Sequence, residues 1–452
     1  MPFTMRRRTS SECTLLNSFS RQLPLLVSAA ALACGDPGET LSEGQGGSAG
    51  ASGSTAGTSG GATGSGGGSL GGSSSGASAA GGSSSGGTNA GGVTSSGGVT
   101  AGGTTASQGG TPNALGGAAA SQGGTTTSSG GMTSGSGGGG NPSCTATGFY
   151  VKDGSLYDVK CKEFVLRGVN YPYTWYATRN SAQDLAAIAA TGANAVRLVL
   201  SSGQRWTKTT ANDLTSLINT AKLNKLVSIV EVHDTTGYSE QSGSVALSNA
   251  TNYWKATDIM AALMGQEAYV ILNIANEPNG NNTSTDWAPS HVAAVQALRT
   301  AGLNHTLMVD APNWGQDWQG TMRGGGGASI WNADTKKNLV FSVHMYDVYG
   351  SSSTVTTYFN TFLMNYEAPL VVGEFAADHG TAGDVDEATI MALSESLGVG
   401  YLGWSWAGNS ADLATLDIAT NFNSASLTTW GNRLINGENG IKATSKPCTC
   451  FN

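Results

Sequence analysis

The chain from Cys144 onward predicts a (β/α)8 barrel, an α/β fold. Short apolar or β-branched runs recur about 30 to 40 residues apart, which is typical of repeated strand–helix units that build a parallel sheet. Amphipathic stretches separate these runs, with apolar residues at the 3.6-residue spacing of a helix. No glycine-rich phosphate loop follows the first run, which disfavours the competing fold, an open doubly wound sheet.

Eight such runs are present, the number of strands that closes this barrel. They span residues 165–171, 195–201, 227–234, 269–277, 306–314, 339–347, 370–375 and 401–406. The clearest helical stretches between them are 182–190, 214–223, 292–298 and 388–397. Gly192, Gly302 and Gly398 follow three of these stretches, where a helix C-cap is expected. Residues 144–452 therefore form one domain, large enough to bury its own core.

The first 143 residues have a different composition. Residues 1–33 are predicted to be a signal peptide, because arginines at 6–8 precede an apolar stretch at 23–33 that ends in a small-x-small motif. That stretch is too short to span a bilayer. Residues 34–143 are almost entirely Gly, Ser, Thr and Ala, so they are expected to form a disordered linker. The protein should be secreted or anchored at the outer cell surface, with a lipid at Cys34 and free secretion as the two alternatives.

The charge of the chain points to a neutral partner. Its formal net charge is −8, and no stripe of Lys and Arg is present, so nucleic acid is not expected as a partner. Exported proteins keep disulfides, and four cysteines lie at the two ends of the predicted domain. We expect Cys144 and Cys161 to pair with Cys448 and Cys450, because the first and last units of a closed barrel are neighbours and a Cys448–Cys450 ring would be strained.

Polar residues end the apolar runs, and in a (β/α)8 barrel the carboxyl ends of the strands hold the active site. These candidates are Asn170, Arg197, His233, Asn276, Glu277, His344, Tyr346, Glu374 and Trp404. The five histidines include no H-E-x-x-H or similar pair, so no metal and no cofactor is expected. Glu277 and Glu374 end the fourth and seventh runs, on opposite sides of the barrel. Two carboxylates so placed, about 5 to 5.5 Å apart, indicate a retaining glycosidase.

Six segments in order resemble glycoside hydrolase family 5, a retaining family with catalytic glutamates on strands four and seven. They are RGVN (167–170), EVHD (231–234), NIANEP (273–278), HMY (344–346), GEF (373–375) and WSW (404–406). The segments GFYV, EVHDTTG, VFSVHMY and GDVDE are more specifically similar to bacterial endo-β-1,4-mannanases of that family. The resemblance covers essentially all of residues 148–440.

The resemblance implies a role for each candidate. Glu277 would be the acid/base, with a pKa raised by partial desolvation, and Glu374 the nucleophile, held as a carboxylate by Arg197 and Tyr346. Asn276 would meet the sugar 2-hydroxyl. His233 and His344 would complete the ring around the reacting sugar, and Trp404 would form its stacking floor.

Further aromatic residues are candidate sugar platforms. Trp175, Trp314, Trp318 and Trp406 are assigned to outer positions, whereas Trp206 and Trp254 are expected to pack against helices.

Three segments depart from the mannanase pattern. Pro278 follows the acid/base, Tyr171-Pro172-Tyr173 replaces a His-containing segment, and Ala376-Ala377 follows the nucleophile. The prediction is a monomeric, retaining endo-β-1,4-mannanase acting on β-mannan. The alternatives are an endo-β-1,4-glucanase acting on β-glucan and a non-catalytic surface polysaccharide-binding protein.

Overall fold

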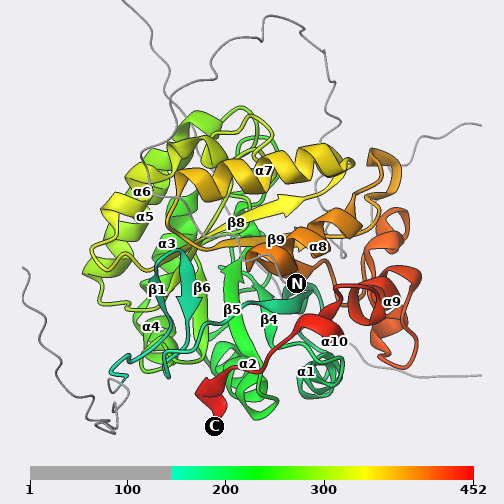
Figure 1. Ribbon diagram of the computed structural model, residues 1–452. Helices are drawn as coiled ribbons and strands as arrows, with labels where there is room; N and C mark the ends of the chain where they lie inside the picture. Colours follow the sequence, from blue (N-terminus) through cyan, green and yellow to red (C-terminus); the bar gives the residue numbers. More distant parts are fainter. Residues whose placement is uncertain (1–143) are drawn as a thin grey trace, which may run out of the picture. The chain divides into compact units, whose positions relative to one another are not determined.

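The computed structural model describes residues 144–452, which form a closed barrel of eight parallel strands surrounded by helices (Figure 1). The predicted signal peptide (1–33), the predicted linker (34–143) and the candidate lipid site Cys34 lie outside the described residues. The barrel strands are β3 (Arg167–Tyr171), β4 (Ala195–Leu200), β5 (Val227–Val232), β6 (Val270–Asn273), β7 (Leu307–Asp310), β8 (Leu339–Met345), β9 (Leu370–Phe375) and β10 (Gly400–Gly403). Each strand pairs with the next along the chain, and β10 closes the barrel by pairing with β3.

The main helices alternate with the strands and cover the outside of the barrel (Figure 1). They are α1 (Ser181–Ala190), α2 (Ala211–Leu223), α3 (Leu247–Trp254), α4 (Thr257–Leu263), α5 (Trp287–Thr300), α6 (Ala328–Ala333), α7 (Ser352–Asn365), α8 (Glu387–Leu397), α9 (Thr429–Asn436) and α10 (Ile441–Thr444). Among the described residues, none of the helices is long and apolar enough to cross a membrane.

All eight predicted strands are confirmed, and the helix ends follow local chemistry. The Thr210 side chain accepts from the Asp213 backbone N–H, and the Asp213 side chain accepts from the Thr210 backbone N–H, so a capping box starts α2. Gly398 ends α8 with a φ of 71°, a left-handed conformation that glycine adopts without steric cost. Gly192 and Gly302 also have positive φ, as expected for residues that follow helix ends.

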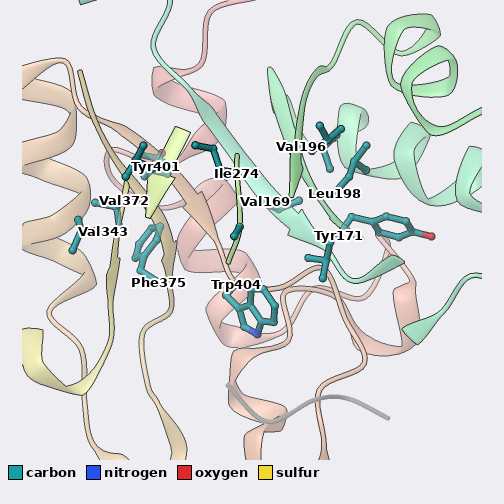
Figure 2. Close-up of a cluster of buried hydrophobic side chains, with 14 of the residues drawn as sticks. Val169, Tyr171, Val196, Leu198, Ile274, Val343, Val372, Phe375, Tyr401 and Trp404 are labelled. Carbon is teal, nitrogen blue, oxygen red and sulfur yellow. The ribbon is translucent and has the colours of Figure 1, made fainter. Parts of the chain in front are cut away.

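The outer core fills the space between the strands and the helices. Figure 2 shows part of it, with Val196 and Leu198 from β4 on one side and Val343 and Val372 from β8 and β9 on the other. These residues alternate with side chains of the same strands that face the barrel interior, as the two-residue period of a strand requires.

The barrel interior changes from apolar to charged along its length. A second apolar cluster contains Ala195, Ile229, Ile271 and Met308. Two residues further along the same four strands stand Arg197, Glu231, Asn273 and Asp310, all completely buried. Because side chains two apart point to the same face of a strand, the charged layer lies directly above the apolar one, at the carboxyl ends.

The cysteine pairing differs from the prediction. Cys144 is bonded to Cys161, and Cys448 to Cys450. The first bond joins two segments that the antiparallel hairpin of β1 (Tyr150–Lys152) and β2 (Ser155–Tyr157) brings back together, which leaves neither cysteine for the C-terminus.

The two ends of the domain are nevertheless neighbours, as the closed barrel predicted. The carboxylate of Asp158 accepts hydrogen bonds from the backbone of Lys160 and Lys162 near the hairpin, and from the backbone N–H and the hydroxyl of Thr449 at the C-terminus. A hydrogen-bonded aspartate therefore fastens the ends in the place where disulfides were expected.

Candidate active site

Arg197 lies at the centre of the site and joins side chains from several strands. It is completely buried on β4. Its guanidinium donates to Glu374 Oε1 at 2.7 Å, to Asn276 Oδ1 at 2.7 Å and to Asn170 Oδ1 at 3.0 Å. Only the interior of a closed barrel lets one side chain reach these residues at once, so Arg197 sets the relative positions of the groups around it.

Glu374 is held as a carboxylate by donors on both oxygens. Arg197 contacts Oε1, and Tyr346 donates its hydroxyl to Oε2 at 2.9 Å. Hydrogen bonds and a nearby cation both favour the charged form of a carboxyl group, which is the form that a nucleophile needs.

A register shift between β8 and β9 turns Glu374 toward the site. Val343 is paired with Val372, but His344 is paired with Glu374, so Gly373 is the extra residue of a bulge. A Cβ at position 373 would lie 2.2 Å from Ser342 Oγ, a distance that real side chains do not tolerate. A larger residue at this position, immediately before Glu374, would therefore need the Ser342 side chain to move.

Glu277 follows β6 in a left-handed backbone conformation with a φ of 40°. This conformation is costly for a non-glycine residue and persists where the surroundings enforce it. Here the Glu277 backbone N–H donates to Asp310 Oδ2 at 3.3 Å, and the backbone carbonyl accepts from Gly237 at 2.9 Å. The side chain accepts from His344 Nδ1 at 2.6 Å.

Burial changes the pKa of Glu277. It raises the pKa of Glu277 to about 7, against the opposing effect of the hydrogen bond and charge of His344. Burial alone would lower the pKa of His344, but the charges of Glu374 and Asp310 and hydrogen bonds to Asp310 and Glu277 raise it to about 10. His344 is therefore an imidazolium at neutral pH, next to a glutamic acid that can still hold a proton.

The carboxyl groups of Glu277 and Glu374 lie close enough together for a retaining mechanism. One oxygen of Glu277 and one of Glu374 lie within 4.8 Å of each other. Retaining glycosidases place these groups about 5 to 5.5 Å apart, whereas inverting enzymes need about 6.5 to 9.5 Å to admit a water molecule. His344 Nδ1 belongs to the same cluster, a set that could in principle ligate a cation. The three residues are, however, joined to their neighbours by the hydrogen bonds described above.

The raised pKa of Glu277 predicts the alkaline side of the pH profile. The first chemical step needs Glu277 protonated, so we expect kcat/KM to fall as pH rises through about 7, since kcat/KM reports the ionisation of the free enzyme. Initial rates on a soluble oligosaccharide across the pH range measure this limb. An alkaline limb absent up to about pH 9 would contradict the role of Glu277 as acid.

A second group of predicted residues contains Asn276, His233 and Trp404. Asn276 accepts from Arg197 and donates to Thr236 Oγ1 at 2.8 Å. His233 Nδ1 lies 3.0 Å from Glu231 Oε1, and its ring stacks on that of Trp404 with centroids 5.6 Å apart. These contacts link Asn276 to Arg197 and His233 to Trp404, and their contacts with a sugar stay predictions.

Three of the predicted aromatic platforms differ in how far their rings are exposed. Trp175 is partly buried and packs edge-on against His233 and Trp404, inside the site. Trp314 is almost buried, and its indole donates to Glu240 Oε2 at 2.8 Å. Trp318 is 44 % exposed and is available to stack on a polymer at the rim.

One tryptophan assignment needs correction. Trp406 is completely buried, and its backbone is bonded to Asn170 and Ala419, so it offers no exposed ring to an outer sugar. Trp404 is equally buried and its ring stacks on His233, so its role as a stacking floor stays a prediction. The Trp206 ring lies 5.3 Å from that of Trp175 and 5.9 Å from that of His233, so it contacts residues of the site as well as the short helices that carry them. Trp254, in contrast, is buried in α3 as expected, where it donates to the Ile274 carbonyl.

Two buried acids of the site were missed by the sequence analysis. Asp310 ends β7 and contacts Arg197, His344 and the Glu277 backbone, whereas Glu231 on β5 pairs with His233. Asp310 could have been found by the rule used for the other strands, because it is the polar residue that ends the apolar run of β7. Glu231 stands inside an apolar run, and only the closed barrel shows that it faces the interior.

Two glutamates at carboxylate-pair distance, at the carboxyl ends of opposite strands of a parallel (β/α)8 barrel, define a glycoside hydrolase. Comparison with known proteins gives the family. Residues 157–410 match the model of the cellulases of glycosyl hydrolase family 5. The chain belongs to glycosyl hydrolase family 5.

Characterised relatives are similar over the same domain. The chain is 50% identical to the mannan endo-1,4-beta-mannosidase of Cellvibrio japonicus over 307 residues, which cover 68% of this chain and 70% of that protein. It is 49% identical to the mannan endo-1,4-beta-mannosidase of Streptomyces lividans over 312 residues, 69% of this chain and 80% of the relative.

Solved structures agree. The beta-mannanase from Thermomonospora fusca has a TM-score of 0.65 and 47% identity, and the match covers 68% of this chain and all of that chain. The beta-mannanase from Streptomyces thermolilacinus, solved with mannohexaose, has a TM-score of 0.65 and 45% identity, with 68% of this chain and 99% of that chain covered.

Proposed function

We propose that this protein is an endo-acting, retaining β-1,4-mannanase. The observation that carries the mechanism is the pair of glutamates with oxygens within 4.8 Å, one with a raised pKa and the other held by two donors. The substrate class is supported by the similarity over the whole domain to relatives named as mannan endo-1,4-beta-mannosidases and to a beta-mannanase solved with mannohexaose.

The reaction proceeds in two displacements. Glu374 attacks the anomeric carbon while Glu277 gives its proton to the glycosidic oxygen, so the C–O bond breaks and a glycosyl ester forms on Glu374. Glu277, now a carboxylate, takes a proton from water, and the water oxygen displaces Glu374 from the anomeric carbon. Each step inverts that carbon, so the product keeps the β-configuration, and Glu277 ends protonated again.

The charges around the glutamates change little between the two steps. As the ester forms, Glu374 loses its negative charge and Glu277 gains one, while His344 Nδ1 lies 3.5 Å from Glu374 Oε2 and 2.6 Å from Glu277 Oε1. The imidazolium therefore compensates whichever carboxyl group is ionised. Fixed groups of this kind stabilise developing charge without reorganisation during the reaction.

An endo-β-1,4-glucanase is the alternative that one feature of the sequence favours. Pro278 follows the acid/base, as in many cellulases of the family. The departure at Tyr171 gives this alternative no support, because the Tyr171 hydroxyl donates to Asp184 on α1 and the side chain is completely buried. Tyr171 therefore does not border a sugar site.

We expect soluble mannan to be cut at least about tenfold faster than carboxymethyl-cellulose, expressed as kcat/KM, because this preference needs only about 1.4 kcal/mol of differential transition-state binding. Reducing-end release by residues 144–452 from mannan, galactomannan, carboxymethyl-cellulose and xylan measures it. Equal rates on mannan and carboxymethyl-cellulose would refute the mannanase assignment and leave the two-glutamate mechanism intact. No release from any polymer would instead support a binding protein without turnover.

The N-terminal region carries a separate proposal, that residues 1–33 direct export and are removed. The three arginines, the apolar stretch and the small-x-small motif support it. Mass spectrometry of the mature N-terminus distinguishes a diacylglycerol-modified Cys34 from an unmodified, freely secreted chain. A mature protein that retains residues 1–33 would contradict export by this route.

A further inference from the structure

Asp310 occupies a central position beneath both catalytic glutamates. It is completely buried at the end of β7. Its Oδ2 lies 3.2 Å from Arg197 Nη2 and 3.4 Å from His344 Nε2, and it accepts the backbone N–H of Glu277 at 3.3 Å. Its Oδ1 accepts from Asn273 Nδ2 at 2.9 Å. The Asp310 carboxylate therefore contacts Arg197, which bonds to Glu374, and His344, which bonds to Glu277. It also accepts a hydrogen bond from the Glu277 backbone.

His344 is fixed between Asp310 and the two glutamates. Its Nδ1 faces Glu277, whereas its Nε2 makes no hydrogen bond within residues 144–452 and lies at an ion-pair distance of 3.4 Å from Asp310 Oδ2. The backbone N–H of His344 donates to the Gly315 carbonyl at 2.8 Å. A Cβ at Gly315 would lie 2.7 Å from the His344 ring, so the loop after β7 is packed against the ring face. The imidazole therefore has one orientation, with one nitrogen toward each acid.

The charged groups that face this pair come from every neighbouring strand. They are Arg197 on β4, Glu231 on β5, Glu277 after β6 and Glu374 on β9. His291 on α5 is close enough to sense the charge of Asp310. Although burial opposes it, the charges of His344 and Arg197 hold the pKa of Asp310 well below its usual range, so Asp310 is an anion throughout the working range.

We propose that Asp310 is a positioning residue that fixes both the orientation and the positive charge of His344, and through His344 sets the pH at which Glu277 gives up its proton. The proposal rests on the proposed function, in which Glu277 is the acid/base. Asp310 contacts neither the sugar nor the glycosidic bond in this scheme. Asp310 acts indirectly, through the His344 imidazolium that is hydrogen-bonded to Glu277.

The direction of the effect follows from the distances. Without the Asp310 charge, His344 loses its anionic partner at Nε2, and its pKa falls, because burial is then opposed by fewer charges, chiefly that of Glu374. A neutral His344 removes a positive charge 2.6 Å from Glu277 Oε1, which raises the pKa of Glu277. Loss of the Asp310 charge itself acts in the opposite direction, but Asp310 reaches only the Glu277 backbone. The nearer charge dominates, so the alkaline limb moves to higher pH.

The test is Asp310→Asn, which keeps the shape and removes the charge. We expect the alkaline limb of kcat/KM to move up by about 0.5 to 1 pH unit, and kcat at the optimum to fall at least about tenfold with little change in KM. Asp310→Glu, which keeps the charge, should leave the limb where it is. The matched control is Asp317→Asn, another completely buried aspartate, which follows the same strand and accepts from Met322 and Arg323 rather than from the catalytic groups. It should leave the limb unmoved.

A second measurement is independent of turnover. The chain has five histidines, so the ¹⁵N imidazole signals of the folded domain can be assigned one by one, with His344→Asn to identify position 344. Wild-type His344 should remain doubly protonated at pH 8, whereas in Asp310→Asn it should titrate at lower pH. A neutral His344 in the wild type at pH 7 overturns the proposal even if Asp310→Asn does not fold. An unshifted alkaline limb of kcat/KM in a folded Asp310→Asn variant also overturns the proposal. Inactivity of the wild type on mannan overturns only the substrate assignment.

Discussion

Glu374→Ala is expected to lower kcat on mannan by more than about 10⁴-fold, because no other group can form the glycosyl ester. The domain should stay folded, since Arg197 keeps Asn276, Asn170 and Asp310 as partners. The removed side chain leaves space for a small anion on the face from which the nucleophile attacked. With an aryl β-mannobioside as substrate, added azide should restore turnover and give the α-glycosyl azide, of inverted configuration.

Glu374→Gln is the matched control for this rescue. It removes the negative charge but fills the same space, so azide should not restore its activity. Circular dichroism and thermal unfolding of both variants show that they are folded. Wild-type rates for Glu374→Ala in ordinary buffer, or equal rescue of both variants, would remove Glu374 from the role of nucleophile.

Glu277→Ala should differ from Glu374→Ala in its dependence on the leaving group and in the product formed with azide. General acid catalysis contributes about 10² to 10⁴-fold, so hydrolysis of mannan should fall by this amount. Formation of the ester from a substrate with an acidic leaving group, such as dinitrophenol, needs no proton and should be much less affected. Azide should again restore turnover, but now by attacking the glycosyl ester on Glu374, so the product should be the β-glycosyl azide, of retained configuration.

The opposite stereochemistry of the two azide products distinguishes the two glutamates. ¹H NMR of the anomeric proton identifies each product. Glu277→Gln offers a control that retains the volume and the hydrogen-bonding partner of His344 but cannot donate an acidic proton. If Glu277→Ala lowered the rates for good and poor leaving groups equally, Glu277 would be a structural residue and another acid would have to be sought.

The barrel and the centre of the site could be predicted because their signals are local. Each strand is an apolar run that ends in a polar residue, and the barrel geometry brings those ends together, so Arg197, Glu277, His344, Tyr346 and Glu374 converge as predicted. The sequence also placed the ends of the domain side by side. These conclusions need only the order of the elements and the two-residue period of a strand.

Other features depend on contacts that no local pattern specifies. The bulge at Gly373 arises from a register shift between two strands, and the close approach there is to Ser342 on the neighbouring strand. Chain closure alone predicts cysteine pairs across the barrel, whereas the hairpin brings Cys144 and Cys161 together. Trp206 lies in the loop after β4, and its contact with Trp175 could not be inferred from spacing.

The covalent ester on Glu374 is the central claim, and trapping it is the most direct measurement. A 2-deoxy-2-fluoro-β-mannobiosyl fluoride should form the ester and hydrolyse slowly, because the fluorine at C2 destabilises both transition states while fluoride still leaves readily. Intact mass spectrometry of the wild-type domain should show the addition of one 2-deoxy-2-fluoromannobiosyl group, and peptide mapping should place it on Glu374. A label on any other residue, or a product of inverted configuration with no trapped ester, would contradict the mechanism.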